Sequence, residues 1–145
     1  MAATAQVFAL AWLGEADAAC AAGVETVDRC RQAFGTDHWL ALIAAAALTF
    51  ALVGGAQNQQ ALDIGQEACM RSRQEFGPDH WVTLIAAAAL TFALGALGEI
   101  QQALTLGLDT LDRSSRTLGA QHPIAVSLRQ QLNIDALPDR YPMPD

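Results

Sequence analysis

The sequence repeats itself with a period of 42 residues, and this repeat limits the possible folds more than any other feature. Residues 34–53 and 76–95 are identical at sixteen of twenty positions. The same register aligns "LGAQHP" (118–123) with "FGTDHW" (34–39) and "FGPDHW" (76–81). A period between twenty and fifty residues is typical of solenoids and other arrays, in which each unit buries its apolar face against the next.

Each period contains two segments of helical length. The first is apolar and follows an Asp that we expect to be its N-cap, Asp37 in one copy and Asp79 in the next. The second, such as residues 58–77, is amphipathic with one polar face. Turns containing Gly separate the segments, and no alternating run typical of a strand occurs. The pattern predicts an all-α chain of seven helices in about three and a half repeats.

The two apolar segments raise the question of a membrane. Residues 39–56 and 81–98 each contain eighteen residues without a charge, close to the length of a transmembrane helix. Most of these residues are Ala, which gains little from lipid, and no excess of basic residues marks one side. A helix packed between neighbours in a solenoid is also apolar nearly all round. We therefore interpret both segments as inner helices of a cytoplasmic repeat protein that does not enter the membrane.

Charge and cysteine content narrow the class of function. The 145-residue chain has a net charge of −7, and its eight basic residues are all Arg. It therefore lacks the basic surface with which proteins bind nucleic acid. The three cysteines have no CxxC spacing and suggest thiols in a reducing compartment. No Gly-rich phosphate loop or HExxH pattern is present, so we expect neither enzymatic activity nor a cofactor.

Three histidines share one position of the repeat: His38, His80 and His122. Equivalent points on packed helices lie roughly 10 Å or more apart. One zinc ion needs its nitrogen ligands within about 2.1 Å. These histidines therefore cannot share one ion, and we expect them to pack at the repeat junctions instead of forming a metal site.

The repeat unit resembles the tetratricopeptide repeat of the kinesin-light-chain type, as found in many actinobacterial proteins. The features that carry the resemblance are the "FG-x-D-H-W" and "LG-x-Q-H-P" motifs before the first helix and the small residues at the turn. The family turn glycine falls on Gly14 and Gly98, whereas Ala56 departs from it. The resemblance implies a right-handed α-solenoid over residues 1–135, with an extended Pro-rich tail at 136–145. Its repeat units would be about 1–36, 37–78, 79–120 and a partial 121–135.

The resemblance also implies a binding surface, because the first helices of this family line a concave groove that receives a peptide or a helix. By register, the partner-binding residues would be Phe8, Trp12, Ile43, Ala46, Phe50, Val53, Ile85, Ala88, Phe92 and Ile134. Four of them occupy one position of successive repeats and predict an apolar ladder: Phe8, Phe50, Phe92 and Ile134. If this register is off by one helical position, the Phe row lies in the core instead.

The polar clamp of the family is missing. Many relatives hold the ligand backbone with an Asn, and the matching positions here are Ala5, Ala47, Ala89 and Gln131. A partner would therefore be held through apolar contacts, which argues against binding of a chaperone tail.

Trp39 and Trp81 stand where the family commonly has Pro, at the edge of the expected groove. They would either pack on the preceding helix or contact a ligand or a second copy. We predict a protein interaction module that binds an apolar or amphipathic peptide or helix, with no nucleic acid and no membrane as partner. Two alternatives stay open: a homodimer that fills its own groove, and a carrier of a small hydrophobic molecule.

Overall fold

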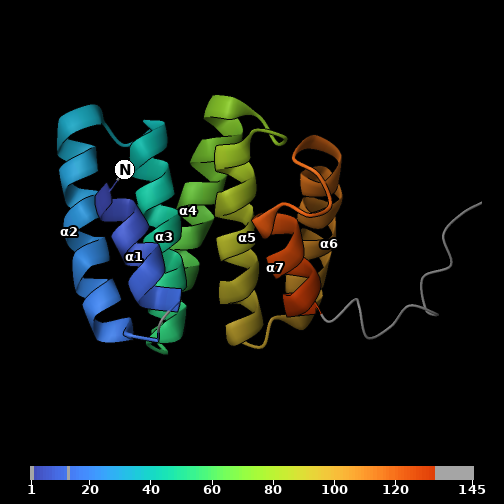
Figure 1. Ribbon diagram of the computed structural model, residues 1–145, viewed down its shortest axis with the longest axis horizontal. Coiled ribbons are helices and arrows are strands. Elements are labelled where there is room, and N and C mark those ends of the chain that lie inside the picture. Colours follow the sequence, from blue (N-terminus) through green and yellow to red (C-terminus); the bar gives the residue numbers. More distant parts are fainter. Residues whose placement is uncertain (1, 13, 133–145) are drawn as a thin grey trace, which may run out of the picture.

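The computed structural model of the chain describes residues 2–12 and 14–132. The described residues form seven α-helices and no strand (Figure 1). The helices are α1 (Ala2–Trp12), α2 (Ala16–Phe34), α3 (Trp39–Gly54), α4 (Asn58–Phe76), α5 (Trp81–Ala96), α6 (Ile100–Thr117) and α7 (Pro123–Leu132). The expected all-α array of seven helices is therefore confirmed.

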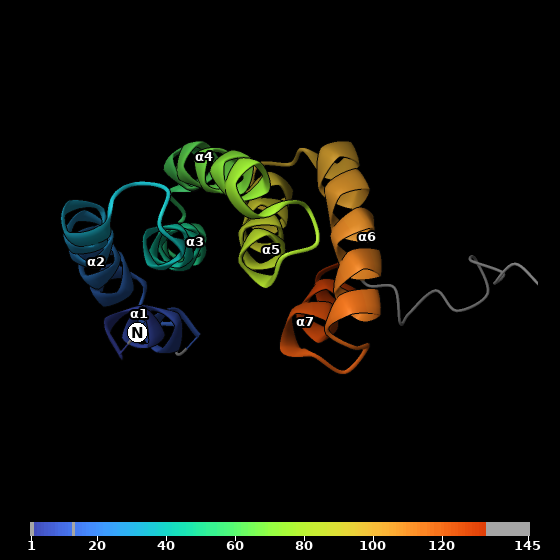
Figure 2. The ribbon, with the colours of Figure 1, turned by 90° about the horizontal axis from the view of Figure 1, so that it is seen from above.

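Successive helices run in opposite directions and form a curved array. Seen from above, α1, α3, α5 and α7 line the inner side of the curve, and α2, α4 and α6 lie outside them (Figure 2). α3 and α5 pack on each other as well as on their outer neighbours. The short turns that join an inner helix to the next outer helix all lie at the lower end of the array in Figure 1. The inner helices together form the concave face.

The composition of α3 follows from its surroundings. Because neighbours cover it on several sides, every residue from Ala41 to Thr49 is buried. Ala has the highest helix propensity and the smallest apolar side chain, so an Ala-rich helix forms readily and lets its neighbours approach closely. Within the described residues, none of the helices has both the length and the apolar character needed to cross a membrane.

Glycines inside the outer helices allow this close approach. A Cβ added to Gly65 of α4 would lie 3.2 Å from Cγ2 of Thr49 and 3.5 Å from Cα of Leu90. Thr49 is fully buried, and its hydroxyl donates a 2.9 Å hydrogen bond to the carbonyl of Ala45. Gly23 and Gly107 occupy the same repeat position and face similar contacts. The aligned glycines in the sequence are thus contact points between helices.

The predicted N-caps at Asp37 and Asp79 are wrong, because the inner helices begin after the histidine that follows. His38 is in the extended conformation, and its Nδ1 accepts a 3.2 Å hydrogen bond from the N–H of Leu40. His80 and His122 make the same bond one and two repeats later. The histidine side chain therefore satisfies one of the unpaired donors at each helix start.

The two aspartates form ion pairs with the outer helix of the same repeat. Asp37 accepts a 2.8 Å hydrogen bond from Nη1 of Arg71, and Asp79 accepts one of the same length from Arg113. Each pair joins residues 34 positions apart in the chain. The spacing recurs because both partners belong to the 42-residue repeat.

Candidate binding groove

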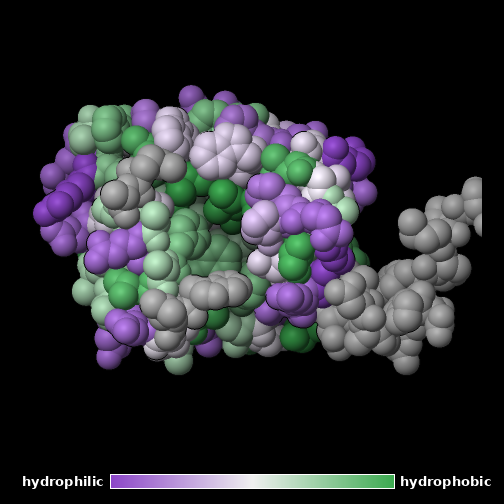
Figure 3. All heavy atoms as spheres, viewed as in Figure 1, coloured by the Kyte–Doolittle hydropathy of each residue, from purple (hydrophilic) through white to green (hydrophobic). Residues whose placement is uncertain are grey.

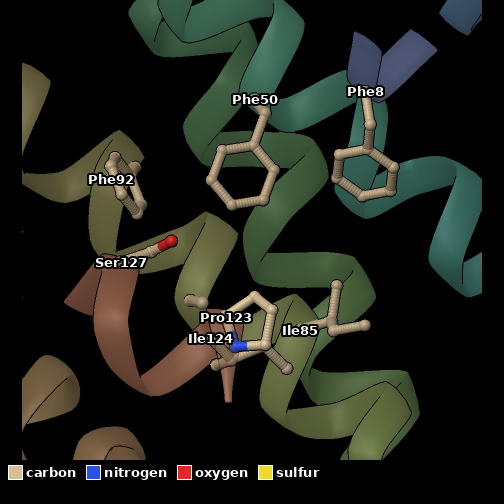
Figure 4. A pocket seen from close by; sticks show the side chains of 8 residues that line it. Phe8, Phe50, Ile85, Phe92, Pro123, Ile124 and Ser127 are labelled. Carbon is tan, nitrogen blue, oxygen red and sulfur yellow. The ribbon is translucent and has the colours of Figure 1, made fainter. Parts of the chain in front are cut away.

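The concave face contains an apolar hollow of about 350 Å³. It lies among helices α1, α3, α5 and α7, and hydrophobic residues gather around it in the middle of the face (Figure 3). We call this hollow the groove. Its lining residues are Phe8, Phe50, Ile85, Ala88, Phe92, Pro123, Ile124 and Ser127 (Figure 4).

Three phenyl rings form a continuous row along the groove. The ring centroids of Phe8 and Phe50 are 5.8 Å apart, and those of Phe50 and Phe92 are 5.1 Å apart. The second pair is edge-to-face with an interplanar angle of 65°, a favoured arrangement of aromatic rings. All three side chains are half-buried. The rings therefore pack on one another and still present surface to the groove.

The other expected groove residues differ between repeats. Ile85 of α5 is half-buried and lines the groove, whereas its counterpart Ile43 of α3 lies in the core at 4% exposure. Ala88 borders the groove but is buried at 4% exposure, and its counterpart Ala46 is buried at 0%. The difference arises because α1 packs on α3, and Phe8 contacts the buried cluster that includes Ile43. Ile43 and Ala46 thus support the groove from below and are not part of its surface.

Three further expected residues are not among the lining residues. Val53 is half-buried and packs against the main core. Trp12 is the last residue of α1, but its side chain lies outside the described part of the structure. Ile134, the fourth expected member of the ladder, also lies outside the described residues.

The groove includes two α7 residues that the sequence analysis did not assign to it. Pro123 and Ile124 begin α7 and face the groove beside Ser127 (Figure 4). The 42-residue register indicated that α7 reaches the groove, because it aligns Ser127 with Ile85 and Pro123 with Trp81, both of which were expected at or beside the groove. The partial fourth repeat therefore closes one side of the groove.

Six aromatic rings form a second row at the opposite end of the inner helices from the short turns. We call these residues the aromatic edge: Phe34, His38, Trp39, Phe76, His80 and Trp81. The rings of Trp39 and Trp81 contact each other edge-on, with their centroids 5.7 Å apart. His38 and His80 each stack on the Phe that ends the preceding outer helix. Trp81 remains 39% exposed. The histidines therefore pack at the repeat junctions, as expected, and also cap the helices.

The charged side chains lie mainly on the outer helices. Arg71 and Arg113 each pair with an acid one turn earlier, as well as with the aspartates before α3 and α5. The pKa of Arg71 is raised by its hydrogen bonds to Asp37 and then to Glu67. Among the described residues that line the groove, Ser127 alone has a polar side chain. This described lining therefore contains no charged group that could act as an acid, a base or an anion anchor.

The described residues offer little for catalysis or metal binding. Burial raises the pKa of the Cys69 thiol, although the nearby Arg73 lowers it, and Cys69 is only 3% exposed. Burial also raises the pKa of Cys20, with Asp17 as a second cause. Thiols with raised pKa values are poor nucleophiles. In the described residues, no group of three or more His, Cys, Asp or Glu side chains is placed to hold a metal ion.

Comparison with known proteins identifies the repeat. The family model described as tetratricopeptide repeat matches residues 7–40 and 83–124, which together make up slightly more than half of the chain. A comparison with curated proteins found no match. The matched segments contain the second half of α1, all of α2 and α6 and most of α5, together with His38, His122 and two of the three rings of the Phe row. The chain therefore belongs to the tetratricopeptide repeat family.

Proposed function

We propose that the chain is a protein-binding module whose groove takes an apolar or amphipathic segment of a partner. Tetratricopeptide repeats generally mediate protein–protein interactions. The observation that carries the proposal is the row of Phe8, Phe50 and Phe92 along an open apolar hollow. Apolar surface gathered in a hollow favours association, because its burial removes it from water.

The size of this surface is compatible with a useful affinity. A partner that buries about 400 Å² of apolar surface gains roughly 10 kcal/mol at ~25 cal/mol per Å². Association itself costs an estimated 4–15 kcal/mol in lost translational and rotational freedom. At the low end of that cost the net gain is about 6 kcal/mol, which corresponds to a dissociation constant of tens of micromolar. Additional contacts, such as those of the aromatic edge, would raise the affinity.

The proposed contact surface combines the sequence-derived residues that line the groove with the α7 residues beside them. Phe8, Phe50, Ile85, Ala88 and Phe92 form its centre, and α7 forms one wall. Trp39 and Trp81 would border it at one end. We also propose that the repeats are of the kinesin-light-chain type, because of their 42-residue period, and that the protein works in the cytoplasm, where its three free thiols stay reduced.

A double substitution, Phe50→Ser with Phe92→Ser, tests the proposal. It replaces two of the three rings, and we expect it to abolish capture of partner proteins while the far-ultraviolet circular dichroism stays helical. The matched control is the double substitution Val24→Ser with Met70→Ser, which removes two large apolar side chains at 50% and 53% exposed positions on the outer helices α2 and α4. If the folded double variant still captures the same partners as the unchanged chain, the groove is not the binding site.

The groove volume supports a second candidate, a small hydrophobic ligand. Small-molecule sites commonly have volumes of about 300–1,000 Å³, and the groove falls at the low end of this range. Native mass spectrometry of the purified chain would show a bound small molecule as added mass. Light scattering across a dilution series tests the third possibility, a homodimer, because a second copy that occupies the groove would give a stable dimer.

A further inference from the structure

We propose that the partner segment is an amphipathic α-helix of about three turns with a basic end, and not an extended peptide. This inference rests on the proposed function, because it concerns the same groove. Three features of the structure carry it: the polar groups that the groove offers, the length of its apolar stripe, and the charges at one end.

The groove offers almost no partners for a peptide backbone. In the part of the chain that the structure describes, Ser127 has the only polar side chain among the lining residues. Three of the four positions that could hold a clamp are occupied by alanines, of which Ala47 and Ala89 are fully buried; the fourth, Gln131, is exposed and lies beside Gly95, outside the groove lining. An extended segment in the groove would bury N–H and C=O groups without partners, at about 1–3 kcal/mol for each group. An α-helix avoids this cost because its backbone groups bond to one another.

The apolar stripe on α5 has the dimensions of a short helix. Trp81, Ile85, Ala88 and Phe92 are spaced by four, three and four residues and share one face. The eleven steps from the first to the last span about 16 Å at 1.5 Å per residue, which is three helical turns. Ala88 lies near the middle of this stripe and lines the groove. Its small side chain would let a second helix approach closely, as the alanines of α3 do.

The flanking helices would complete the packing of such a helix. α1 and α7 lie on either side of the concave face, with α3 and α5 behind it (Figure 2). A helix in the groove would therefore contact inner helices on several sides, much as α3 contacts its own neighbours. The occupant would extend the helical packing of the array.

The turn end of the array is acidic. Glu15 and Glu99 precede α2 and α6, and neither side chain forms a cap hydrogen bond; Asp17 lies in the first turn of α2. All three side chains are exposed, and none takes part in an ion pair of the described residues. The negative ends of the α3 and α5 dipoles lie at this end together with the positive ends of α2, α4 and α6, so the helix dipoles offset one another and the acidity comes from the side chains. Arg129 in the last turn of α7 offsets part of this charge, so the end remains net acidic.

This charge distribution favours a partner helix that carries Lys or Arg at the end nearest the turns. The apolar stripe would supply most of the affinity, and the charges would set the direction in which the helix lies. Screening by salt should weaken the charge contribution and leave the apolar contribution in place.

A displayed peptide library can test the inference with defined probes. One half would hold 14-residue peptides of Ala, Leu, Lys and Glu with apolar residues at helical spacing. The other half would have the same composition with a central Pro, which breaks a helix. Selection on the unchanged chain, with counter-selection on the double Phe50→Ser and Phe92→Ser variant, should enrich the helical half, with Lys gathered at one end.

The possible outcomes separate the inference from the proposed function. Enrichment of the Pro half would overturn the helix inference and leave the groove as a peptide site. Enrichment of helices without a preferred Lys end would overturn the predicted orientation. No enrichment from either half would overturn the inference and the proposed peptide-binding function together.

A substitution that removes one negative charge at the turn end tests the predicted direction of the bound helix, with one selected peptide as the probe. Glu99→Gln should weaken binding about two- to fivefold at low salt, the range of an exposed ion pair, and have little effect at high salt. The matched control is Glu75→Gln, which removes one exposed acid from the other end of the array. If both substitutions weaken binding equally, the acidic turn end does not orient the partner.

Discussion

Ala56 is the one described residue other than glycine with a positive φ, and replacing it with Gly should stabilise the protein. Its φ is 60°, whereas the equivalent residues one repeat away, Gly14 and Gly98, have φ values of 80° and 84°. The three turns share a hydrogen bond from the next residue back to the inner helix. This bond is 2.9 Å from Gln57 to Leu52, and 3.0 Å in the other two turns. The three turns therefore share this hydrogen bond and the positive φ, and only in the turn at Ala56 does the residue with positive φ have a Cβ.

The size of the effect follows from two opposing contributions. The left-handed conformation costs a residue with a Cβ roughly 1–2 kcal/mol. Gly at the same place makes the unfolded chain more flexible, which costs about 0.4–1 kcal/mol. Ala56→Gly should therefore raise the free energy of unfolding by about 0.8 kcal/mol, or the melting temperature by about 3 °C for a chain of this size.

The reverse change, Gly98→Ala, is the matched control. A Cβ on Gly98 would meet no atom within 4 Å, so its cost comes from conformation and not from a clash. We expect a loss of about the same size as the gain at Ala56. Urea unfolding followed by circular dichroism measures both, and an unchanged m value shows that only stability has changed. Equal stability of Ala56→Gly and the unchanged chain would refute the argument.

Three other predictions concern single side chains. His80→Ala should lower the free energy of unfolding by about 1 kcal/mol through loss of the cap, and His80→Asn should restore most of it; if the Asn variant is no more stable than the Ala variant in urea, the cap has no energetic role. Cys69 should react with a thiol reagent far more slowly than the half-exposed Cys30, as mass spectrometry of timed samples would show. Burial raises the pKa of Cys69 in the folded state, so the stability that the neutral thiol contributes is present below the ordinary thiol pKa and is lost as the pH rises through the raised pKa. Urea unfolding midpoints measured across this pH range should therefore fall less with rising pH in Cys69→Ala than in the unchanged chain. The ion pair of Arg113 with Asp79 should give a favourable coupling in a double-mutant cycle at low salt that disappears at high salt, and a coupling that persists would contradict a solvent-exposed pair.

The array was predictable because its sequence repeats. A 42-residue period with two helical patterns allows few folds besides a stack of helix pairs, and the near-identical copies fix the register between them. Details below the level of one helical turn were less accessible. The starts of α3 and α5 depend on whether Asp or the following His supplies the cap, and both residue types can accept a hydrogen bond. The structure shows that His38 does so and leaves Asp37 to pair with Arg71.

The candidate site was predictable where the repeat alone decides it. Phe8, Phe50 and Phe92 share a register position, and rings at equivalent positions of adjacent helices are close enough to stack. The Trp39–Trp81 contact follows in the same way. The walls of the groove depend instead on α1 and α7, whose sequences differ from those of α3 and α5. A repeat pattern does not predict how these two helices pack, because it describes each unit as if its neighbours were the same.

Ile43 and Ile85 show why register alone cannot separate groove from core. They occupy one position in nearly identical helices, yet Ile43 is buried and Ile85 lines the groove. The difference lies in the adjacent inner helices: α1 packs closely on α3, whereas the described part of α7 packs less closely on α5. A side chain on an inner helix is therefore core where the adjacent inner helix covers it and binding surface where it is left uncovered. In this chain the hollow lies beside α5, between it and α7, and the proposed partner helix would cover the side of α5 that faces the hollow.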